Sequence, residues 1–365
     1  MSSPDGFRKA IGSVVEPITG KTLDDLRAVK EAAVSETKTQ LCIKLRFRFP
    51  QKNAEREIRR RLLAKVKELG FESLDLHVES GIVAHRVKLG LKPLKGVKNI
   101  LAVGSAKGGV GKSTVALGLA LALSRQGARV GLLDADIYGP SVPILLGARE
   151  KPEISDGKAM LPVAAHGLQV NSIGFFVSEK EPLAWRGPMA SNAIRELAEK
   201  TQWQDLDYLV VDLPPGTGDI QLTLAQSIPV TAAVVVTTPQ TLACADAARG
   251  LRLFEKVGIP VVGLVENMAY YKCPDCGRVE RIFGSGGAEQ LAESFGVPIV
   301  GSLPIAPAVS GCCDVTEANA SSDFVQEMEK AALRVAVSVS AMPRDMTSVM
   351  PSVKVEPLDG SQDRT

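Results

Sequence analysis

Residues 105–114 read Ser105-Ala106-Lys107-Gly108-Gly109-Val110-Gly111-Lys112-Ser113-Thr114. This stretch follows the apolar run 100–103 and precedes the helix-like run 115–120, so strand, glycine loop and helix come in the order of a phosphate-binding loop. Because glycine lacks a Cβ atom, such a loop can turn its backbone N–H groups toward a polyphosphate, and the helix adds the positive end of its dipole. The alternative, a glycine-rich turn without a ligand, is disfavoured because all three contexts agree.

Individual residues of the loop have separate expected roles. We expect Lys112 on the β- and γ-phosphates of the nucleotide and Ser113 on Mg²⁺. The other loop residues predicted to bind nucleotide are Gly108, Gly109, Val110, Gly111 and Thr114. The loop departs from the standard Gly-x-x-x-x-Gly-Lys-Ser/Thr pattern at Ala106, its first position, and it gains Lys107 beside the glycines.

Acidic residues follow two further apolar runs. The run 129–133 leads into Asp134-Ala135-Asp136, and the run 208–211 leads into Asp212. Carboxylates at strand ends near a phosphate loop can hold Mg²⁺ and orient the attacking water, so Asp134 and Asp212 are predicted on the magnesium side. The glycine-rich stretch 213–218 resembles a switch loop that senses a γ-phosphate through backbone N–H groups.

The order of apolar runs predicts the fold. From residue 98 onward, near-continuous apolar runs alternate with helix-length segments, which is typical of an α/β fold with a mostly parallel sheet covered on both faces. Ahead of it we predict a small basic α+β domain over 1–92, with a helix over 5–15, strands over 29–34, 40–49, 74–78 and 83–91, and a helix from a cap at Asn53 to Leu69. A linker over 93–98, a P-loop ATPase domain over 99–340 and a mobile tail over 341–365 complete the expected organisation.

Charge and composition limit the possible classes. The chain has 365 residues and a net charge of +2, but residues 1–98 hold about 21 Lys and Arg against about 12 Asp and Glu. Strand 40–49 alternates apolar residues with Lys44, Arg46 and Arg48, which predicts a basic outer face. Aromatic residues are few and no nucleic-acid reader motif is present, so a solvated face or a docking surface for an acidic protein is favoured over nucleic acid. With no long apolar run and no leader-like N-terminus, a cytoplasmic protein without a membrane span is expected.

Two of the six cysteines lie in one tight turn, Cys273-Pro-Asp-Cys276-Gly. Pro and Gly can shape a knuckle whose backbone N–H groups face the sulfurs, but two thiolates are only half of the four that zinc or a 4Fe–4S cluster usually takes. A twofold pairing of two chains would complete the set. Bridging of a cluster, a zinc knuckle and a structural or redox thiol pair remain open on this reasoning. Cys42, Cys244 and the adjacent Cys312 and Cys313 are interpreted as packing residues.

Three motifs in their order, at 105–114, 134–141 and 212–219, resemble the Mrp (ApbC-like) branch of the deviant P-loop ATPases. The resemblance implies that Lys107 reaches across a dimer interface to the partner's nucleotide and that Asp136 positions the hydrolytic water. It also implies that Asn267 binds adenine, and that Cys273 and Cys276 of two chains bridge a labile 4Fe–4S cluster. The small N-terminal domain is similar to one found on iron–sulfur assembly factors, although the Thr/Cys-Pro pattern of that domain is absent where Phe49-Pro50 stands.

The resemblance leads to an expected function. A homodimer would bind and slowly hydrolyse ATP with Mg²⁺, carry a 4Fe–4S cluster and transfer it to apo iron–sulfur proteins, together with assembly factors and without membrane or nucleic acid. The alternatives are a positioning ATPase of the Min/Par type, a zinc-knuckle ATPase and a reductase. The positioning role is disfavoured because residues 324–330 are not strongly basic and the cysteine knuckle would be unexplained.

Overall fold

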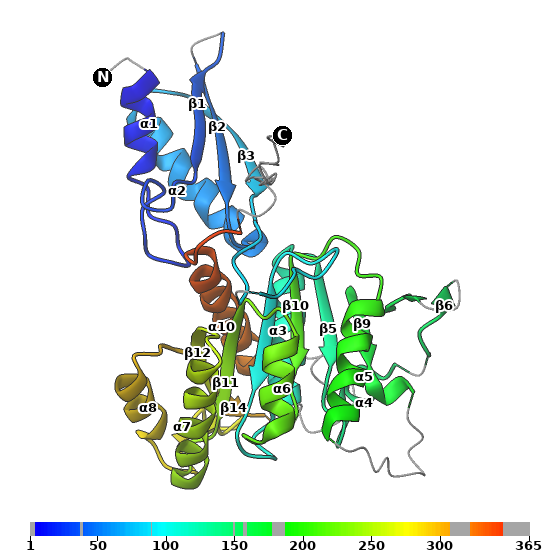
Figure 1. Ribbon diagram of the computed structural model, residues 1–365. Coiled ribbons are helices and arrows are strands. Elements are labelled where there is room, and N and C mark those ends of the chain that lie inside the picture. Colours follow the sequence, from blue (N-terminus) through cyan, green and yellow to red (C-terminus); the bar gives the residue numbers. More distant parts are fainter. Residues whose placement is uncertain are drawn as a thin grey trace, which may run out of the picture.

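The computed structural model describes residues 4–36, 39–88, 90–148, 150–155, 159–176, 187–306 and 322–345. It contains a small N-terminal unit built on a three-stranded sheet and a larger domain built on a nine-stranded sheet (Figure 1). The predicted fold class, an α/β domain with a mostly parallel sheet preceded by a small α+β unit, is confirmed. Cys312, Cys313 and most of the predicted tail lie outside the described residues.

The N-terminal unit covers one face of its sheet with helices. Its elements are α1 (Pro4–Gly12), β1 (Val29–Val34), β2 (Gln40–Phe47), α2 (Glu55–Glu68) and β3 (Ser73–Ser80). Strand β2 is central, antiparallel to β1 and parallel to β3. Its alternate residues are buried, from Leu41 to Phe47, whereas Lys44 and Arg46 lie on the other face. The predicted half-buried strand with a basic outer face is therefore confirmed.

Two local predictions for this unit are wrong. Asn53 does not cap the helix: it lies in a 3₁₀ turn, Lys52–Ala54, and Ala54 precedes α2 without a side-chain cap bond. The backbone N–H of Asn53 instead donates to the side chain of Gln126, so a tertiary contact replaces the local one. Residues 83–91 form no strand in their described part, because they leave the sheet and pair with the larger domain only at His85.

The larger sheet orders its strands β13-β12-β11-β4-β10-β5-β9-β8, and β14 pairs with β12. Its long strands are β4 (Ile100–Gly104), β5 (Val130–Asp134), β9 (Leu168–Ser172), β10 (Tyr208–Asp212), β11 (Ala232–Thr237), β12 (Val261–Lys272) and β14 (Ile299–Ile305). The seven strands predicted from apolar runs are these seven. Central strand β4 is parallel to both its neighbours, so the carboxyl ends of β4, β10 and β11 lie at one edge.

The sequence does not predict four short strands of the larger domain. The ones found only in the structure are β6 (Ile154–Ser155), β7 (Ala159–Met160), β8 (Val163–Ala165) and β13 (Val279–Glu280). Strands β8 and β13 add antiparallel edges to the sheet. Such strands carry too few residues for a periodic pattern, and their pairing depends on neighbours distant in sequence.

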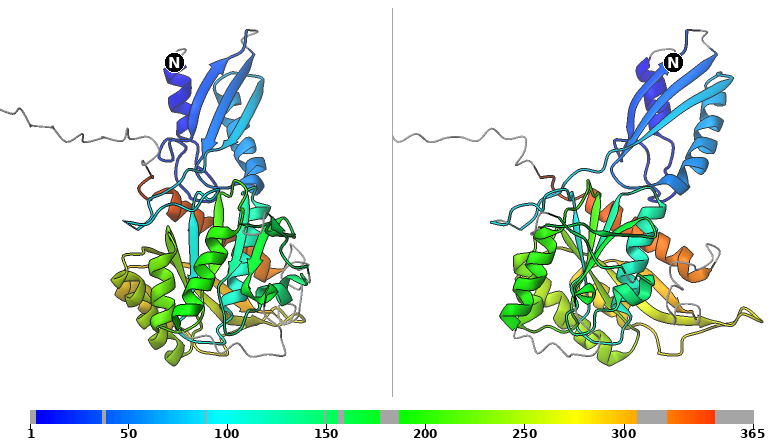
Figure 2. Two further views of the ribbon diagram at one scale, coloured as in Figure 1. Left: turned by 45° about the vertical axis from the view of Figure 1, so that its right-hand side comes forward. Right: turned by 90° about the vertical axis from the view of Figure 1, so that its right-hand side faces the viewer.

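Helices cover both faces of the larger sheet (Figure 2). They are α3 (Lys112–Arg125), α4 (Val142–Leu146), α5 (Gly187–Lys200), α6 (Asp219–Ser227), α7 (Thr241–Lys256), α8 (Gly287–Phe295) and α10 (Asp323–Ser340). Most buried side chains of α3 and α10 belong to one core cluster, and most of those of α5 to α8 belong to the other. No described helix combines the length and the apolar character that a membrane span needs.

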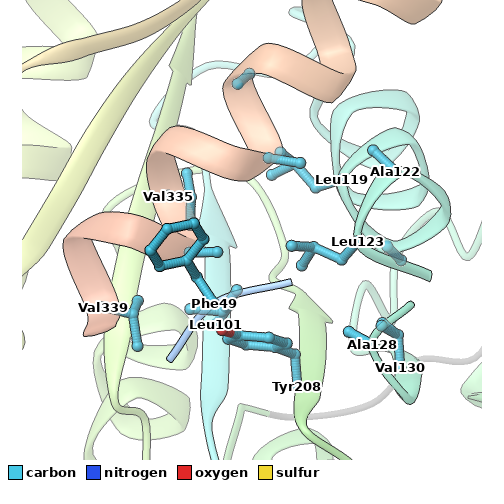
Figure 3. Packing of buried hydrophobic residues seen from close by; sticks show 14 of the residues in the cluster. Phe49, Leu101, Leu119, Ala122, Leu123, Ala128, Val130, Tyr208, Val335 and Val339 are labelled. Atoms are coloured by element: carbon cyan, nitrogen blue, oxygen red, sulfur yellow. The ribbon is translucent and has the colours of Figure 1, made fainter. Parts of the chain in front are cut away.

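The two units share one continuous core. The cluster that contains α3 and α10 also contains the buried residues of β2 and α2. Phe49, just after β2, is 2% exposed and lies near Leu101, Tyr208 and Val335 of the larger domain (Figure 3). The predicted linker boundary at 93–98 stays a prediction, but apolar side chains of both units pack into one cluster.

A buried polar contact also joins the units. The Nδ1 atom of His85 lies 2.9 Å from the Asn99 carbonyl oxygen, and the Asn99 amide donates to the backbone oxygens of Val83 and Asp207. Burial lowers the pKa of His85 from its usual 6.5, since an apolar environment disfavours the charged ring.

This burial predicts a pH dependence of stability. Because the folded pKa is depressed, the unfolded chain binds more protons, so the stabilisation is complete above pH 6.5 and is lost as the pH falls from there through the folded pKa. Between about pH 7 and pH 5, we expect this contribution to lower the unfolding temperature of the wild type relative to that of His85→Gln. His77→Gln is the matched control, since its ring is 70% exposed. Equal slopes in wild type and His85→Gln, measured by calorimetry, would contradict the assignment.

Candidate functional site

Parallel register brings the predicted acids to the phosphate loop. Asp212, the last residue of β10, pairs in register with Val103 of β4 and with Asp134 of β5. One residue after β4 ends, the loop 105–111 begins and leads into α3. The carboxylates of Asp134 and Asp212 and the loop therefore meet at one sheet edge, as the sequence predicts.

The loop backbone needs glycine at two positions. Gly109 and Gly111 have φ angles of 79° and 80°, which favour glycine, and Gly111 directly precedes α3. Space above the loop is open, because a Cβ atom on Gly108 or Gly109 would meet no atom within 4 Å. A Cβ on Gly111 would instead collide with the Asn267 amide. The loop is thus open on its outer side and closely supported on its inner side.

Lys112 carries a buried positive charge that two carboxylates compensate. The side chain is 6% exposed, and its ammonium donates to Asp212 Oδ1 at 2.5 Å. Asp136 Oδ2 lies 3.4 Å from the same nitrogen, and the Ser113 hydroxyl oxygen lies 3.3 Å from it. Four of the residues predicted to handle phosphate, Mg²⁺ or water therefore lie around one point.

Burial changes the proton affinity of the acids. It raises the pKa of Asp134 to about 7, with a further increase from the negative charge of Asp212. Burial also raises the pKa of Asp212, which the nearby ammonium of Lys112 counteracts. The ammonium of Lys112 thus favours the charged form of Asp212, whereas burial and the charge of Asp212 disfavour the charged form of Asp134.

The two acids of the 134–136 motif have different surroundings. Asp134 is fully buried: Oδ1 accepts from the N–H of Asp136, and Oδ2 accepts from Val142 N–H and the Ser172 hydroxyl at 3.1 and 2.9 Å. This carboxyl holds the loop between β5 and α4. The magnesium role of Asp134 stays a prediction, and the geometry favours Asp212, whose buried Oδ2 has no hydrogen-bond partner among the described residues.

The second glycine-rich loop is tied to the first. The N–H of Gly216, at a φ of 108°, donates to the backbone oxygen of Ser105 at 2.9 Å. The Ser105 hydroxyl donates to the backbone oxygen of Lys107. The side chain of Lys107 is only partly buried and forms no hydrogen bond or ion pair with any residue in the described part of the chain.

Strand β12 contacts the phosphate loop 105–111 through the side chain of Asn267. Asn267 is buried and its amide donates to the backbone oxygen of Val110 at 2.9 Å, so this side chain fixes the loop; its adenine role stays a prediction. Sequence reasoning missed Glu266, which is 2% exposed and whose Oε1 lacks a partner among the described residues. It also missed Ser172, which contacts Asp134. Ser172 is the last residue of β9, and Glu266 closes the apolar run 261–266 inside β12; these positions are the one signal that could have found them.

The cysteine pair lies at the tip of a hairpin. Strand β12 continues past Asn267 to Lys272 and returns as β13, with Tyr271 opposite Glu280. Between them the N–H of Gly277, at a φ of 72°, donates to the Cys273 oxygen at 2.9 Å and closes the turn. The hairpin projects beyond the body of the domain (Figure 2). Five strand residues, Met268 to Lys272, separate Asn267 from Cys273, a span of at most about 20 Å.

The sulfur environment matches the predicted knuckle. Backbone N–H groups of Cys276 and Asp275, in that order of effect, lower the pKa of the Cys273 thiol. Cys276 is exposed and Cys273 is partly exposed. Among the described residues, no group of three or more His, Cys, Asp or Glu side chains could hold a metal, so this chain offers the two thiols as a pair.

The buried charges predict a thermodynamic coupling. In Lys112→Met, the carboxylates of Asp212 and Asp136 lose their compensating charge, so the free energy of unfolding should fall by about 3–5 kcal/mol. Adding Asp212→Asn should cost much less than the sum of the single changes. Lys107→Met, which removes a lysine from the same loop, should change stability by less than about 0.5 kcal/mol. Urea unfolding of the four variants measures these values; a simple sum for the double variant would contradict the coupling.

The chain is similar to known proteins. A family model for the NUBPL iron-transfer P-loop NTPases of the ParA group matches residues 96–340. An iron-sulfur cluster carrier protein of Escherichia coli K12 is 46% identical over 309 residues, which cover 83% of each chain. One from Haemophilus influenzae is 52% identical over 260 residues, 71% of this chain and 70% of the relative.

A solved structure gives the same answer. The nucleotide-binding protein of Archaeoglobus fulgidus in complex with ADP superposes with a TM-score of 0.56 and 37% identity, covering 64% of this chain and 92% of that one. The resemblance predicted from the three motifs is confirmed. With the loop, its acids and the cysteine hairpin in place, the chain belongs to the family of NUBPL iron-transfer P-loop NTPases.

Proposed function

We propose that this chain is an ATP-dependent iron–sulfur cluster carrier that works as a homodimer and transfers a 4Fe–4S cluster to apo-proteins. The observation that carries the proposal is the single strand β12, which supports the phosphate loop through Asn267 and ends at an exposed thiol pair. The names of the bacterial relatives, iron-sulfur cluster carrier proteins, support the same function.

ATP is the proposed nucleotide. The open space over Gly108 and Gly109 can accept phosphate oxygens, and Lys112 lies within reach of them at the start of α3. The ADP bound to the similar archaeal protein supports a nucleotide here. Asp136, at the same point as Lys112, is placed to orient a water toward the γ-phosphate.

The residues present fit a magnesium ion. Asp212 Oδ2 is buried and lacks a hydrogen-bond partner among the described residues. The Ser113 hydroxyl and Asp212 Oδ1 both lie beside the Lys112 ammonium. Hard oxygen ligands of this kind are those that Mg²⁺ prefers. Ser113 and Asp212 would hold the ion, which would supply charge neutralisation at the phosphates.

The cluster is the proposed cargo. One chain contributes two thiolates, and a 4Fe–4S cluster usually takes four, so two copies related by a twofold axis would complete the set. The backbone N–H groups that face Cys273 favour its thiolate form, which is the form that binds iron. Exposure of the pair at a hairpin tip allows a second chain and then an apo-protein to approach it.

Anaerobic reconstitution with ferrous iron and sulfide tests the cargo. We expect a broad visible absorbance, a dimer in solution, and about four iron and four sulfide ions per two chains. Cys273→Ala/Cys276→Ala should lose the absorbance, whereas Cys42→Ala, a change in the N-terminal sheet, should keep it. Unchanged absorbance in the double variant would refute the site, and zinc without sulfide in protein purified without oxygen would indicate a zinc knuckle instead.

Mixing two inactive variants tests the role of Lys107. If Lys107 stabilises phosphate charge on the partner's ATP, a Lys107→Ala chain can hydrolyse ATP only beside a chain that keeps this lysine. Asp136→Asn supplies such a chain but is itself expected to be inactive. Random pairing should restore roughly a quarter of the wild-type ATPase rate, because half the dimers are mixed and each has one intact site. A mixture as inactive as its components would show that Lys107 acts within its own chain.

A further inference from the structure

A basic pocket lies where the N-terminal sheet meets the end of the larger domain. It has a volume of about 240 Å³ and is lined by Lys30, Arg46, Arg48, Gly81, Val83 and Arg344. We call it the junction pocket. Four of its six residues are cationic, and they come from three separate segments of the chain.

The N-terminal sheet supplies three of the cations. Arg46 and Arg48 alternate with the buried Phe47 and Phe49, so they face away from the core. Lys30 lies at an irregularity in the β1–β2 pairing, where the register shifts between Val29 and Glu31. The strand alternation and the register shift therefore place these three cations on the sheet.

The larger domain supplies the fourth cation. Arg344 follows α10 and is held against residues 84–86 by two backbone hydrogen bonds of 3.0 Å, from Arg86 N–H to the Pro343 oxygen and from Asp345 N–H to the Ala84 oxygen. An isolated β-bridge joins Arg344 to His85. Backbone pairing thus fixes this arginine beside the other three charges.

Within the described part of the chain no carboxylate forms an ion pair with these cations, and Glu79, whose pKa is lowered first by its hydrogen bond from Lys44, is near enough to Arg46 for that positive charge to lower it further. Glu79, the neighbour of Arg46 in the β2–β3 register, forms its ion pair with Lys44 at 2.6 Å. None of the four lining cations has an ion pair with a described residue. Burial, and then the positive charges of neighbouring arginines, lower the pKa of both Lys30 and Arg48. Clustered like charges are unfavourable unless an anion neutralises them.

We propose that the junction pocket binds a small phosphate-bearing anion. Three guanidinium groups and one ammonium present many N–H donors, and the planar fork of arginine matches phosphate oxygens in two-point contacts. The charges line one pocket rather than a long stripe with stacking aromatics, so a small solute fits better than a nucleic acid.

The junction pocket is distinct from the nucleotide loop. Its lining residue Val83 accepts a hydrogen bond from Asn99, which directly precedes β4, whereas the phosphate loop follows the other end of β4 at Gly104. The five residues of this strand place the two sites about 17 Å apart or more. A bound anion would join β2 to Arg344 and so hold the N-terminal unit against the larger domain.

Binding of inorganic phosphate to the full chain tests this inference, with the nucleotide loop saturated by Mg-ADP. We expect saturable heat in calorimetric titration and a rise in unfolding temperature, relative to sodium chloride at equal ionic strength. Arg48→Gln/Arg344→Gln should weaken binding about tenfold or more. Lys9→Gln/Lys67→Gln, which removes two exposed charges from α1 and α2, should bind as wild type does.

The variants also give a signature in chloride alone. Removing two like charges relieves repulsion, so without phosphate Arg48→Gln/Arg344→Gln should unfold at the same or a higher temperature than wild type. Its unfolding temperature should rise less than that of wild type when phosphate is added. Lys30→Gln provides the same comparison if the double variant does not fold. Equal phosphate binding in wild type and in these variants, or none in wild type, would overturn the proposal.

Two further arms identify the source of the phosphate group. Glycerol 3-phosphate is expected to bind at the same site and with the same variant dependence as inorganic phosphate. Vesicles of phosphatidylcholine with and without phosphatidic acid should not retain the chain. Binding to the acidic vesicles alone, without binding of either solute, would overturn the assignment to a small solute.

Discussion

The compensation of one buried charge constrains the whole site. The ammonium of Lys112 lies inside the protein, where an isolated charge would be very unfavourable, and it is tolerated because Asp212 and Asp136 meet it there. That meeting requires β10 and β5 to end level with the phosphate loop. A slip of one residue in either strand would turn a carboxylate to the other face of the sheet and bury charges without partners. Strand register and site chemistry therefore depend on each other.

Sequence predicts the parts of this site that are local. Each motif stands directly after an apolar run, and parallel strands bring such positions together whatever the order of the strands, so Lys112, Asp136 and Asp212 could be assigned in advance. The sequence does not predict contacts between residues that are distant along the chain. Asn53 has the chemistry of a helix cap, but it lies inside the 3₁₀ turn before α2, where its backbone N–H donates to Gln126 of the larger domain. Residues 83–91 have strand-like composition but leave the sheet to contact Asn99 and the segment after α10.

Equivalent residues in a motif can have different tasks that only packing reveals. Asp134 and Asp136 are two positions apart, yet the first binds the backbone of its own loop and the second faces Lys112. The pattern Asp-x-Asp does not distinguish these orientations. Ser172 determines the difference by donating to Asp134 from a neighbouring strand. The packing of Phe49 between the two units likewise could not be predicted from the sequence, because an apolar residue after a strand does not indicate which unit will cover it.

One backbone angle gives the cysteine hairpin its direction. Met268 follows Asn267 and has a φ of 56°, a conformation rare outside glycine, at a place where the pairing of β12 with β14 shifts register. The strand is bent there, between the nucleotide loop and the thiols. In a pair of chains related by a twofold axis, a change in the tilt of one hairpin toward the axis is matched in the other chain, so the angle between the two hairpins changes by twice that tilt. In the proposed dimer, a slight backbone adjustment beside the phosphate loop would thus change the separation of the two thiol pairs.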